Sequence, residues 1–322
     1  MGRAFAFSIA AMALLAPAAA AAQEWPTKPV KVINGFQPGG PTDLLARILG
    51  EHLHKTLGQP FVVESKPGAS GVVAGQALIA APADGYTIYV VSFGVMVTAR
   101  AMYASMTYDP ATAFAPVTTL VRSPMLLEVS VDTPVKTFKE FATWAKANES
   151  KLNHGSPGAG TQPHLAAELL RLKLGFNSQH IPYRGVAPYA QGMAQREVQW
   201  AFDSPNTGQQ LLKGGHIRLL AVSTDTRWPT FPDAPTLIEA GIADASWPNW
   251  FGLVTAAGVP KPIIDKLAAE TAKGLQLPEV AERIRNAGYE PWTMKPEEMS
   301  AFLERERSRW VAVVKENNIK VE

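Results

Sequence analysis

Cysteine is absent from all 322 residues of the sequence. This absence excludes disulfide bonds, thiolate metal sites and cysteine nucleophiles together, so the fold depends on the packing of its apolar side chains. An excess of one charge is also absent, because 30 Lys and Arg residues are balanced by 28 Asp and Glu residues. A balanced chain offers no basic surface for nucleic acid or for an anionic membrane. We therefore expect a globular protein whose partner is a small molecule.

Long apolar runs are absent as well, except at the N-terminus. There Arg3 precedes an apolar stretch, Ala4–Leu15, and Ala20–Ala22 give the small-residue pattern of a cleavage site. This order is typical of a secretory signal peptide, so we expect residues 1–22 to be removed and Gln23 to begin an exported, soluble chain. An uncleaved membrane anchor is the weaker alternative, because the stretch is mostly alanine and barely long enough to cross a bilayer.

The first part of the mature chain alternates strand and helix patterns. Apolar runs at 30–36, 61–64 and 86–92 suit buried strands, and turns rich in Gly and Pro follow or separate them. Between these runs, apolar residues at 45–53 recur at helical spacing, and an Ala-rich segment at 72–80 suits a second helix. This β-α-β-α-β order predicts a parallel sheet covered by helices.

A similar alternation follows and predicts a second α/β lobe. Its strands are expected near 126–131, 152–155, 179–182, 198–202 and 217–222. The C-terminal part shows helical patterns at 261–275, 278–287 and 296–317. These helices are expected to return to the first lobe and cover it. The predicted division is therefore lobe 1 at 23–123, lobe 2 at 124–240 and a helical return to lobe 1 at 241–322. A hinge is expected near Ser123 and within 224–240.

Two glycine-rich turns stand out because each lies between a strand and a helix, one in each lobe. The first is Gln37–Asp43 and the second is Gly155–Thr161. A glycine turn that leads into a helix exposes backbone N–H groups and the positive end of the helix dipole, so it can hold an anion without a cationic side chain. The alternative is that these glycines serve only turn geometry. Two such turns facing each other across a cleft would grip a carboxylate from both sides.

A series of short motifs along the mature chain matches one known family. The opening, Trp25–Val30 followed by Phe36–Asp43, resembles that of the Bug family, the substrate-binding proteins of tripartite tricarboxylate transporters. Further landmarks of that family follow in the same order: Gly58–Pro60, Pro67–Ala69, Pro82–Thr87, Tyr108–Pro110, Gly155–Gly158 with His164–Leu165, Pro182–Gly185, Leu220–Val222, Pro232–Thr236, Glu239–Gly241 and Trp250–Leu253. An ordered series of this length is far more specific than any one motif.

The resemblance implies both a fold and a function. The fold is a Venus flytrap of the type II periplasmic-binding-protein kind, with two α/β lobes around a ligand cleft. The function is capture of a small di-, tri- or aromatic carboxylate in the periplasm and its delivery to the membrane subunits of a tripartite tricarboxylate transporter. On this interpretation the protein is a monomer, is not an enzyme, uses no cofactor or metal and binds no nucleic acid.

The resemblance also implies which residues contact the ligand, from the two glycine turns and from strand ends, where open parallel sheets usually bind ligands. In the first lobe they are Phe36, Gln37, Gly39, Thr42, Asp43, Ser92 and Phe93, and in the second they are Ser156, Gly158, Thr161, His164, Tyr183, Gly185, Phe202 and Asp203. No residue is expected to be catalytic.

Three of these residues have an ordinary structural explanation as well. Asp43 can cap its helix, His164 can pack at the start of its helix, and Phe202 belongs to a residue type that is more often found in the core. Asp203, directly after Phe202, is the better candidate for a ligand contact.

Two other classes of function compete with transport. An enzyme, either a hydrolase or a nucleotide-dependent protein, is disfavoured because the sequence has no Gly-x-Ser-x-Gly, Walker or His-Glu-x-x-His motif. A sensory protein that docks on a membrane receptor stays open, because sensing and delivery use the same closing cleft. The carboxylate itself also stays open. Phe93, Trp200 and Phe202 would suit an aromatic acid, and the polar glycine turns would suit a short dicarboxylate equally well.

Overall fold

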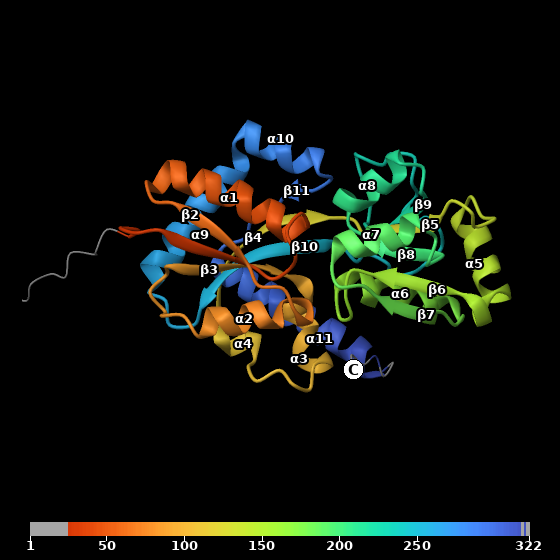
Figure 1. Ribbon diagram of the computed structural model, residues 1–322, viewed down its shortest axis with the longest axis horizontal. Coiled ribbons are helices and arrows are strands. Elements are labelled where there is room, and N and C mark those ends of the chain that lie inside the picture. The colour runs from red at the N-terminus through yellow and green to blue at the C-terminus, as the bar shows by residue number, and fades with distance from the viewer. Residues whose placement is uncertain (1–24, 317–318, 320–322) are drawn as a thin grey trace, which may run out of the picture.

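The computed structural model describes residues 25–316 and residue 319. The predicted signal peptide at 1–22 lies outside the described residues. The chain forms two α/β lobes that lie side by side, and each lobe is built on its own sheet (Figure 1). The two-lobed α/β architecture predicted from the sequence is thereby confirmed.

Lobe 1 contains a six-stranded sheet in the order β11-β4-β10-β3-β1-β2. Its elements are β1 (Val30–Asn34), α1 (Pro41–Leu57), β2 (Phe61–Ser65), the short turn helix η1 (Ala69–Gly71), α2 (Val72–Ile79), β3 (Thr87–Ser92), the π-helical turn η2 (Gly94–Thr98), α3 (Ala99–Met102), α4 (Pro110–Ala113) and β4 (Phe114–Ser123), and later β10 (Asn249–Ala256), α9 (Lys261–Gln276), α10 (Pro278–Asn286), β11 (Glu290–Pro291) and α11 (Pro296–Glu316).

Lobe 2 contains a five-stranded sheet in the order β7-β6-β8-β5-β9. Its elements are β5 (Leu126–Ser130), α5 (Phe138–Ala147), η3 (Glu149–Lys151), β6 (Asn153–Ser156), α6 (Gln162–Leu174), β7 (Gln179–Pro182), α7 (Val186–Ala194), β8 (Trp200–Asp203), α8 (Pro205–Lys213) and β9 (Ile217–Val222). The chain passes between the two sheets twice, after β4 and again between β9 and β10.

The parallel arrangement predicted for the β-α-β-α-β segment is confirmed by β1, β2 and β3, but both complete sheets are mixed. Strand β1 runs parallel to β2 and β3, but β10 is antiparallel to its neighbours β3 and β4. In lobe 2, β6 is parallel to β7 and β8, whereas β5 is antiparallel to β8 and β9. The reason is topological: β4 leads the chain out of lobe 1 and β10 leads it back beside β4. Hydrophobic periodicity identifies a strand but not its direction.

The helix boundaries follow local signals in the sequence. Helix α1 ends at Gly58, which adopts φ +75° and donates its N–H to the carbonyl of His54. Helix α5 begins after Thr137, whose hydroxyl oxygen accepts the N–H of Glu140 at 3.2 Å. Such caps satisfy backbone groups that the helix itself leaves unpaired.

An aromatic seam joins the cores of the two lobes. Phe93 packs edge-to-face on Trp310 with ring centroids 5.2 Å apart, and Trp247 links Trp310 to Phe202 at centroid distances of 6.5 and 6.3 Å. All four rings are almost fully buried. Phe202 therefore has the core position that its residue type favours.

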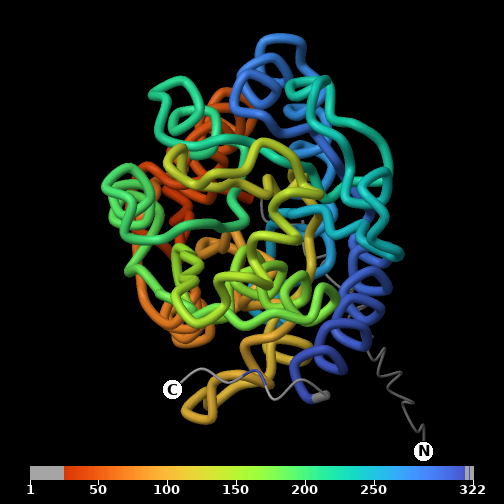
Figure 2. The backbone as a smooth tube through the Cα atoms, turned by 90° about the vertical axis from the view of Figure 1, so that its right-hand side faces the viewer, coloured from red at the N-terminus to blue at the C-terminus, as the bar shows by residue number. Residues whose placement is uncertain are grey.

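The tail helices pack on lobe 1. Helix α9 contacts α1 and β4, and α11 contacts η2, α3 and β4. In the view of Figure 2, α11 runs along one side of the molecule beside the segment that carries η2 and α3. Among the described residues, no helix combines the length and the hydropathy needed to cross a membrane.

Candidate ligand-binding cleft

A cleft between the lobes contains two adjoining chambers, and Phe36 and Pro157 line both of them. The inner chamber has a volume of about 50 Å³ and the outer chamber about 370 Å³. Both helix N-termini that follow the glycine turns border the inner chamber, α1 through Pro41 and Thr42, and α6 through Gln162 and its neighbours. The positive ends of two helix dipoles thus meet at one space. No Lys, Arg or His is among the described residues that line it.

Short polar side chains hold the first-lobe turn. Asn34, the buried last residue of β1, donates to the carbonyl of Phe36 at 2.9 Å and accepts from the N–H of Phe36 at 3.2 Å and from the hydroxyl of Thr42 at 2.6 Å. Asp43 accepts the N–H of Gly39 at 3.1 Å and pairs with Arg47 at 3.0 Å. Asn34 is not among the residues predicted from the sequence, although an Asn at the end of an apolar strand is itself a signal, because a buried amide must be hydrogen-bonded.

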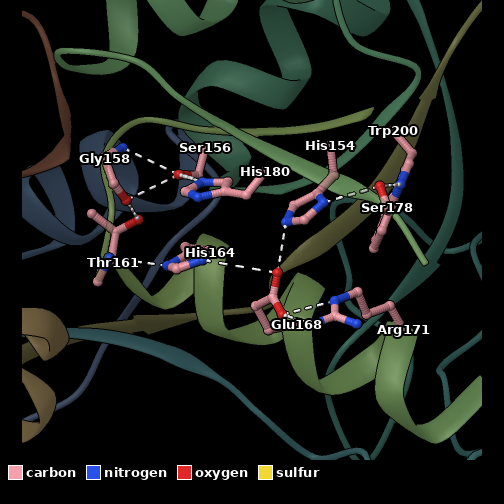
Figure 3. Close-up of polar contacts among 11 residues, drawn as sticks. His154, Ser156, Gly158, Thr161, His164, Glu168, Arg171, Ser178, His180 and Trp200 are labelled. Carbon is pink, nitrogen blue, oxygen red and sulfur yellow. Dashed lines mark hydrogen bonds and ion pairs between the residues drawn. The ribbon is translucent and has the colours of Figure 1, made fainter. Parts of the chain in front are cut away.

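A stack of buried and half-buried imidazoles holds the second-lobe turn (Figure 3). His164 of α6 accepts the N–H of Gly160 on its Nδ1 at 3.0 Å, and His180 of β7 donates from Nε2 to the hydroxyl oxygen of Ser156 at 2.8 Å. Ser156 in turn donates to the carbonyl of Gly158 at 2.9 Å. The rings of His164 and His180 are stacked, with centroids 3.7 Å apart and planes 11° apart.

The environment of the stack keeps two of its rings neutral. Burial lowers the pKa of His164 to about 4, against the opposing charge of Glu168. Burial and the neighbouring His164 lower the pKa of His180 to about 2. Burial pushes the pKa of Glu168 upward, but hydrogen bonds from His154 and Arg171 outweigh it and bring that pKa to about 2. Glu168 is therefore ionised at neutral pH and lies 3.2 Å from Nε2 of His154 and 4.0 Å from Nε2 of His164, whereas the rings of His164 and His180 bear no charge.

Three of these histidines also lie close enough to raise the question of a metal ion. One ligand atom each from His154, His164 and His180 falls within 4.8 Å of the others. A metal ion must lie in the plane of every imidazole that binds it, and stacked rings place their lone pairs in parallel planes. The nitrogens that face the glycine turn are also engaged by Gly160 and Ser156. The geometry therefore favours a hydrogen-bonded stack that positions the turn.

The lobes touch across the outer chamber at one carbonyl group. The carbonyl of Ala159 accepts hydrogen bonds from the hydroxyl of Ser70 at 2.5 Å and from that of Tyr103 at 2.7 Å, both in lobe 1. Gly94 permits a further close approach, since a Cβ at this position would lie 3.0 Å from the carbonyl oxygen of Gly160. The sequence analysis named neither Ser70 nor Tyr103, because their contact partner belongs to the other lobe.

Tyr183 and Gly185 border the outer chamber together with Arg184. The hydroxyl of Tyr183 donates to Glu197 at 2.8 Å, and burial together with this carboxylate raises the pKa of Tyr183 to about 12. Arg184 is the cationic side chain among the described residues that line this chamber. A ligand's outer end would therefore meet one positive charge, in contrast to its inner end.

The structure brings most of the predicted ligand-binding residues to the two chambers. The inner chamber is lined by Phe36, Thr42, Ser92, Phe93, Thr161 and Asp203, and the outer chamber by Phe36, Gln37, Gly158, Tyr183 and Gly185. Gly39, Asp43, Ser156 and His164 support the turns through the hydrogen bonds given above, and Phe202 belongs to the aromatic seam. These five do not line either chamber.

Comparison with known proteins identifies similar chains. Residues 45–319 match the family model described as the tripartite tricarboxylate transporter family receptor. A periplasmic binding protein, BugD, is 33% identical, with a TM-score of 0.86 over 92% of this chain and 100% of that chain.

Two further similar structures contain ligands. Rpa4515 of R. palustris, solved with adipate, is 34% identical, with a TM-score of 0.88 over 92% of this chain and 100% of that chain. MatC of Rhodopseudomonas palustris, solved with bound malate, is 30% identical, with a TM-score of 0.83 over 90% of this chain and 100% of that chain.

Proposed function

Because the chain belongs to the receptor family of tripartite tricarboxylate transporters, which includes Bug proteins, we propose that it captures a small carboxylate and delivers it to the membrane subunits of such a transporter. Members of this family are periplasmic solute-binding receptors, so the chain is a binding protein and not an enzyme. The hydrolase alternative is thereby excluded. Export through a signal peptide at 1–22 and a monomeric state are part of the proposal.

The observation that carries the proposal is the meeting of two helix N-termini at one buried chamber. The first residues of α1 and α6 line the inner chamber from opposite lobes. The hydroxyls of Thr42 and Thr161 donate to Asn34 and to the carbonyl of Gly158, so they hold the two turns in place. Backbone N–H groups in a space without a cation suit one carboxylate group, which they can satisfy with directed hydrogen bonds. The predicted contact residues at these two turns and at the adjoining strand ends are the proposed binding site.

The dimensions of the cleft favour a short dicarboxylate. The inner volume of about 50 Å³ suits a carboxylate head group, and the outer volume of about 370 Å³ has room for the rest of a small ligand, with Arg184 near its far end. Adipate and malate, found in two similar proteins, are acids of this kind. Closure of the lobes over the ligand, with the hinge near Ser123 and within 224–240, would be the event that the membrane subunits recognise.

Thermal unfolding of the purified 23–322 chain tests the proposal. The protein is first freed of bound ligand and is then heated with adipate, malate, citrate, benzoate or aspartate. An acid at one hundred times its dissociation constant should stabilise the fold by about 2.7 kcal/mol. Thr161→Val removes the hydroxyl that donates to the carbonyl of Gly158 at 2.7 Å, so it should loosen the second-lobe turn and weaken binding about tenfold. The matched control is Thr143→Val on an exposed face of α5, where no change is expected. Carboxylate capture is refuted if none of these acids shifts the transition of ligand-free protein.

Uptake experiments separate delivery from sensing. Vesicles that contain the reconstituted membrane subunits should accumulate a radiolabelled acid only when the loaded protein is added outside. Binding without uptake, together with ligand-dependent docking on a purified sensor ectodomain, would instead support the sensory alternative.

A further inference from the structure

An incompletely hydrogen-bonded carboxyl group borders the inner chamber. Asp203, the last residue of β8, lines this chamber and is only 1% exposed. Its Oδ1 accepts the N–H of Ser204 at 2.7 Å, whereas its buried Oδ2 has no hydrogen-bond partner among the described residues. A carboxylate oxygen without donors is costly to bury, so either a proton or a ligand must satisfy it.

A second buried carboxyl group lies on the neighbouring strand. In the antiparallel pair of β5 and β8, Leu126 is opposite Asp203 and Glu128 is opposite Ala201, so the side chains of Glu128 and Asp203 leave the same face of the sheet. Glu128 is fully buried, its Oε1 accepts the hydroxyl of Tyr189 at 2.6 Å, and its Oε2 has no hydrogen-bond partner among the described residues. Each carboxyl group is therefore hydrogen-bonded through one oxygen.

Among the described residues, no positive charge offsets the charges of this pair. The charge that acts on Asp203 is that of Glu128, and the other titratable groups it faces are the phenols of Tyr189 on α7 and Tyr289 ahead of β11. Two like charges in a dry interior cannot both form, so at least one proton stays on the pair. Burial raises the pKa of Glu128 to about 8, and burial with the charge of Glu128 raises that of Asp203 well above its ordinary value.

We propose that Asp203 is a neutral carboxylic acid that donates a hydrogen bond from Oδ2 to one carboxylate oxygen of the ligand, and thereby selects acids without an ammonium group at that end. The inference deepens the proposed function and rests on it. A neutral Asp203 provides an O–H donor, which complements a carboxylate that has only acceptors. An ionised Asp203 would repel the same carboxylate and would attract an ammonium group instead.

Malate and aspartate are matched probes of this choice, because a hydroxyl in one replaces an ammonium in the other. Calorimetric titrations of the 23–322 chain at pH 6 to 9, with adipate, malate and aspartate, are expected to show binding of adipate and malate and rejection of aspartate. Affinity should be constant at the acidic end and should fall about tenfold per pH unit once Asp203 ionises. His164 and His180 do not interfere, since the pKa of His164 is about 4 and that of His180 about 2.

Asp203→Asn replaces the acid by a neutral donor of similar shape. This variant should bind within about tenfold of the wild type at pH 6 and should lose the decline at alkaline pH. Asp233→Asn, an exposed aspartate in the segment that follows β9, is the matched control and should behave as the wild type. A preference for aspartate over malate, or a hundredfold loss of binding in Asp203→Asn, would each overturn the inference.

Infrared spectroscopy tests the protonation state without any ligand. With ¹³C-labelled aspartate, the wild type at pH 7 should show the carbonyl band of a neutral carboxylic acid, and this band should vanish at alkaline pH and in Asp203→Asn. Absence of the band at pH 7 refutes a neutral Asp203 even if Asp203→Asn does not fold. If the band is present but no acid binds to ligand-free protein, the proposed function has failed and the selection of ligands fails with it, whereas the neutral state of Asp203 stands.

Discussion

The two glycine turns both lead from a strand into a helix that borders the inner chamber, but different side chains hold them in place. The first-lobe turn is held by the amide of Asn34 and by Asp43, whose partner Arg47 has a side chain that is 59% exposed. The second-lobe turn is held by His164 and His180, whose rings are stacked. The comparison shows that each glycine-rich turn depends on side chains outside it, Asn34 for the first and His164 and His180 for the second. It also predicts different responses to acid, truncation and salt.

Acid should distinguish the two turns most strongly. Below their ordinary pKa of about 6.5, His164 and His180 bind protons when the chain unfolds but stay neutral in the fold, so the unfolded state binds more protons. The free energy of unfolding should therefore fall as the pH drops from about 6.5 toward 4, by about 1.4 kcal/mol per pH unit for each imidazole. Urea unfolding at a series of pH values measures this slope.

His180→Gln isolates one imidazole of the stack. Its amide can still donate to Ser156 but does not titrate, so the slope should decrease by about 1.4 kcal/mol per pH unit. The control is His216→Gln, because His216 is exposed in the turn after α8. An unchanged slope in His180→Gln would mean that the stack does not exclude protons.

Truncation of the Asn34 side chain should destabilise the first-lobe turn more than any other truncation there. Asn34→Ala removes the partner of the Phe36 N–H and of the Thr42 hydroxyl at a fully buried position. The expected loss is roughly 3 kcal/mol of unfolding free energy, with ligand binding weakened more than tenfold because Phe36 and Thr42 line the inner chamber. Urea unfolding and calorimetric titration measure the two effects.

Asn34→Asp is the graded control for this prediction. It keeps the oxygen that accepts from Phe36 and Thr42 but loses the N–H₂ group that donates to Phe36 and Ser65. Its stability should fall between those of the wild type and Asn34→Ala. Normal ligand affinity in Asn34→Ala would show that the turn keeps its shape without this amide.

The two turns also show which features the sequence could predict and which it could not. Apolar runs located β1, β2, β3 and the five strands of lobe 2, and Gly58 located the end of α1, because these signals are local. They did not locate β4 or β10. His154 and His180, which are far apart in the chain, become neighbours only through the register of β6 on β7, which pairs them directly. No spacing rule gives that register, so the sequence analysis named His164 but not the stack around it.

The acid pair and the contact between the lobes were hidden for the same reason. Asp203 was predicted to contact the ligand, and the structure places it on the inner chamber. Its neighbour Glu128 lies on an antiparallel strand whose direction the sequence does not reveal. Ser70 and Tyr103 meet Ala159 only when the two lobes are in place. A family resemblance transfers residues of the turns themselves more readily than the side chains behind them.

The smallest expected loss of stability comes from the salt bridges that support the turns. Each turn has one Arg–carboxylate pair behind it, so the two pairs can be compared directly. Arg171 pairs with Glu168 at 2.6 Å, with side chains that are 22% and 8% exposed. Arg171→Ala leaves Glu168 buried beside the imidazole stack and should cost roughly 2 kcal/mol of unfolding free energy. Arg47→Ala removes an exposed partner of Asp43 and should cost less than about 1 kcal/mol.

Salt should separate the two variants further. The contribution of the exposed Arg47 pair should largely vanish at about 1 M salt, where the Debye length is about 3 Å, whereas the contribution of Arg171 should persist because its pair is mostly buried. Unfolding of both variants and of the wild type at low and high salt gives the comparison. Equal costs and equal salt dependence would contradict the assignment of a buried support to the second turn and an exposed one to the first, because burial is what makes the loss of one charge expensive.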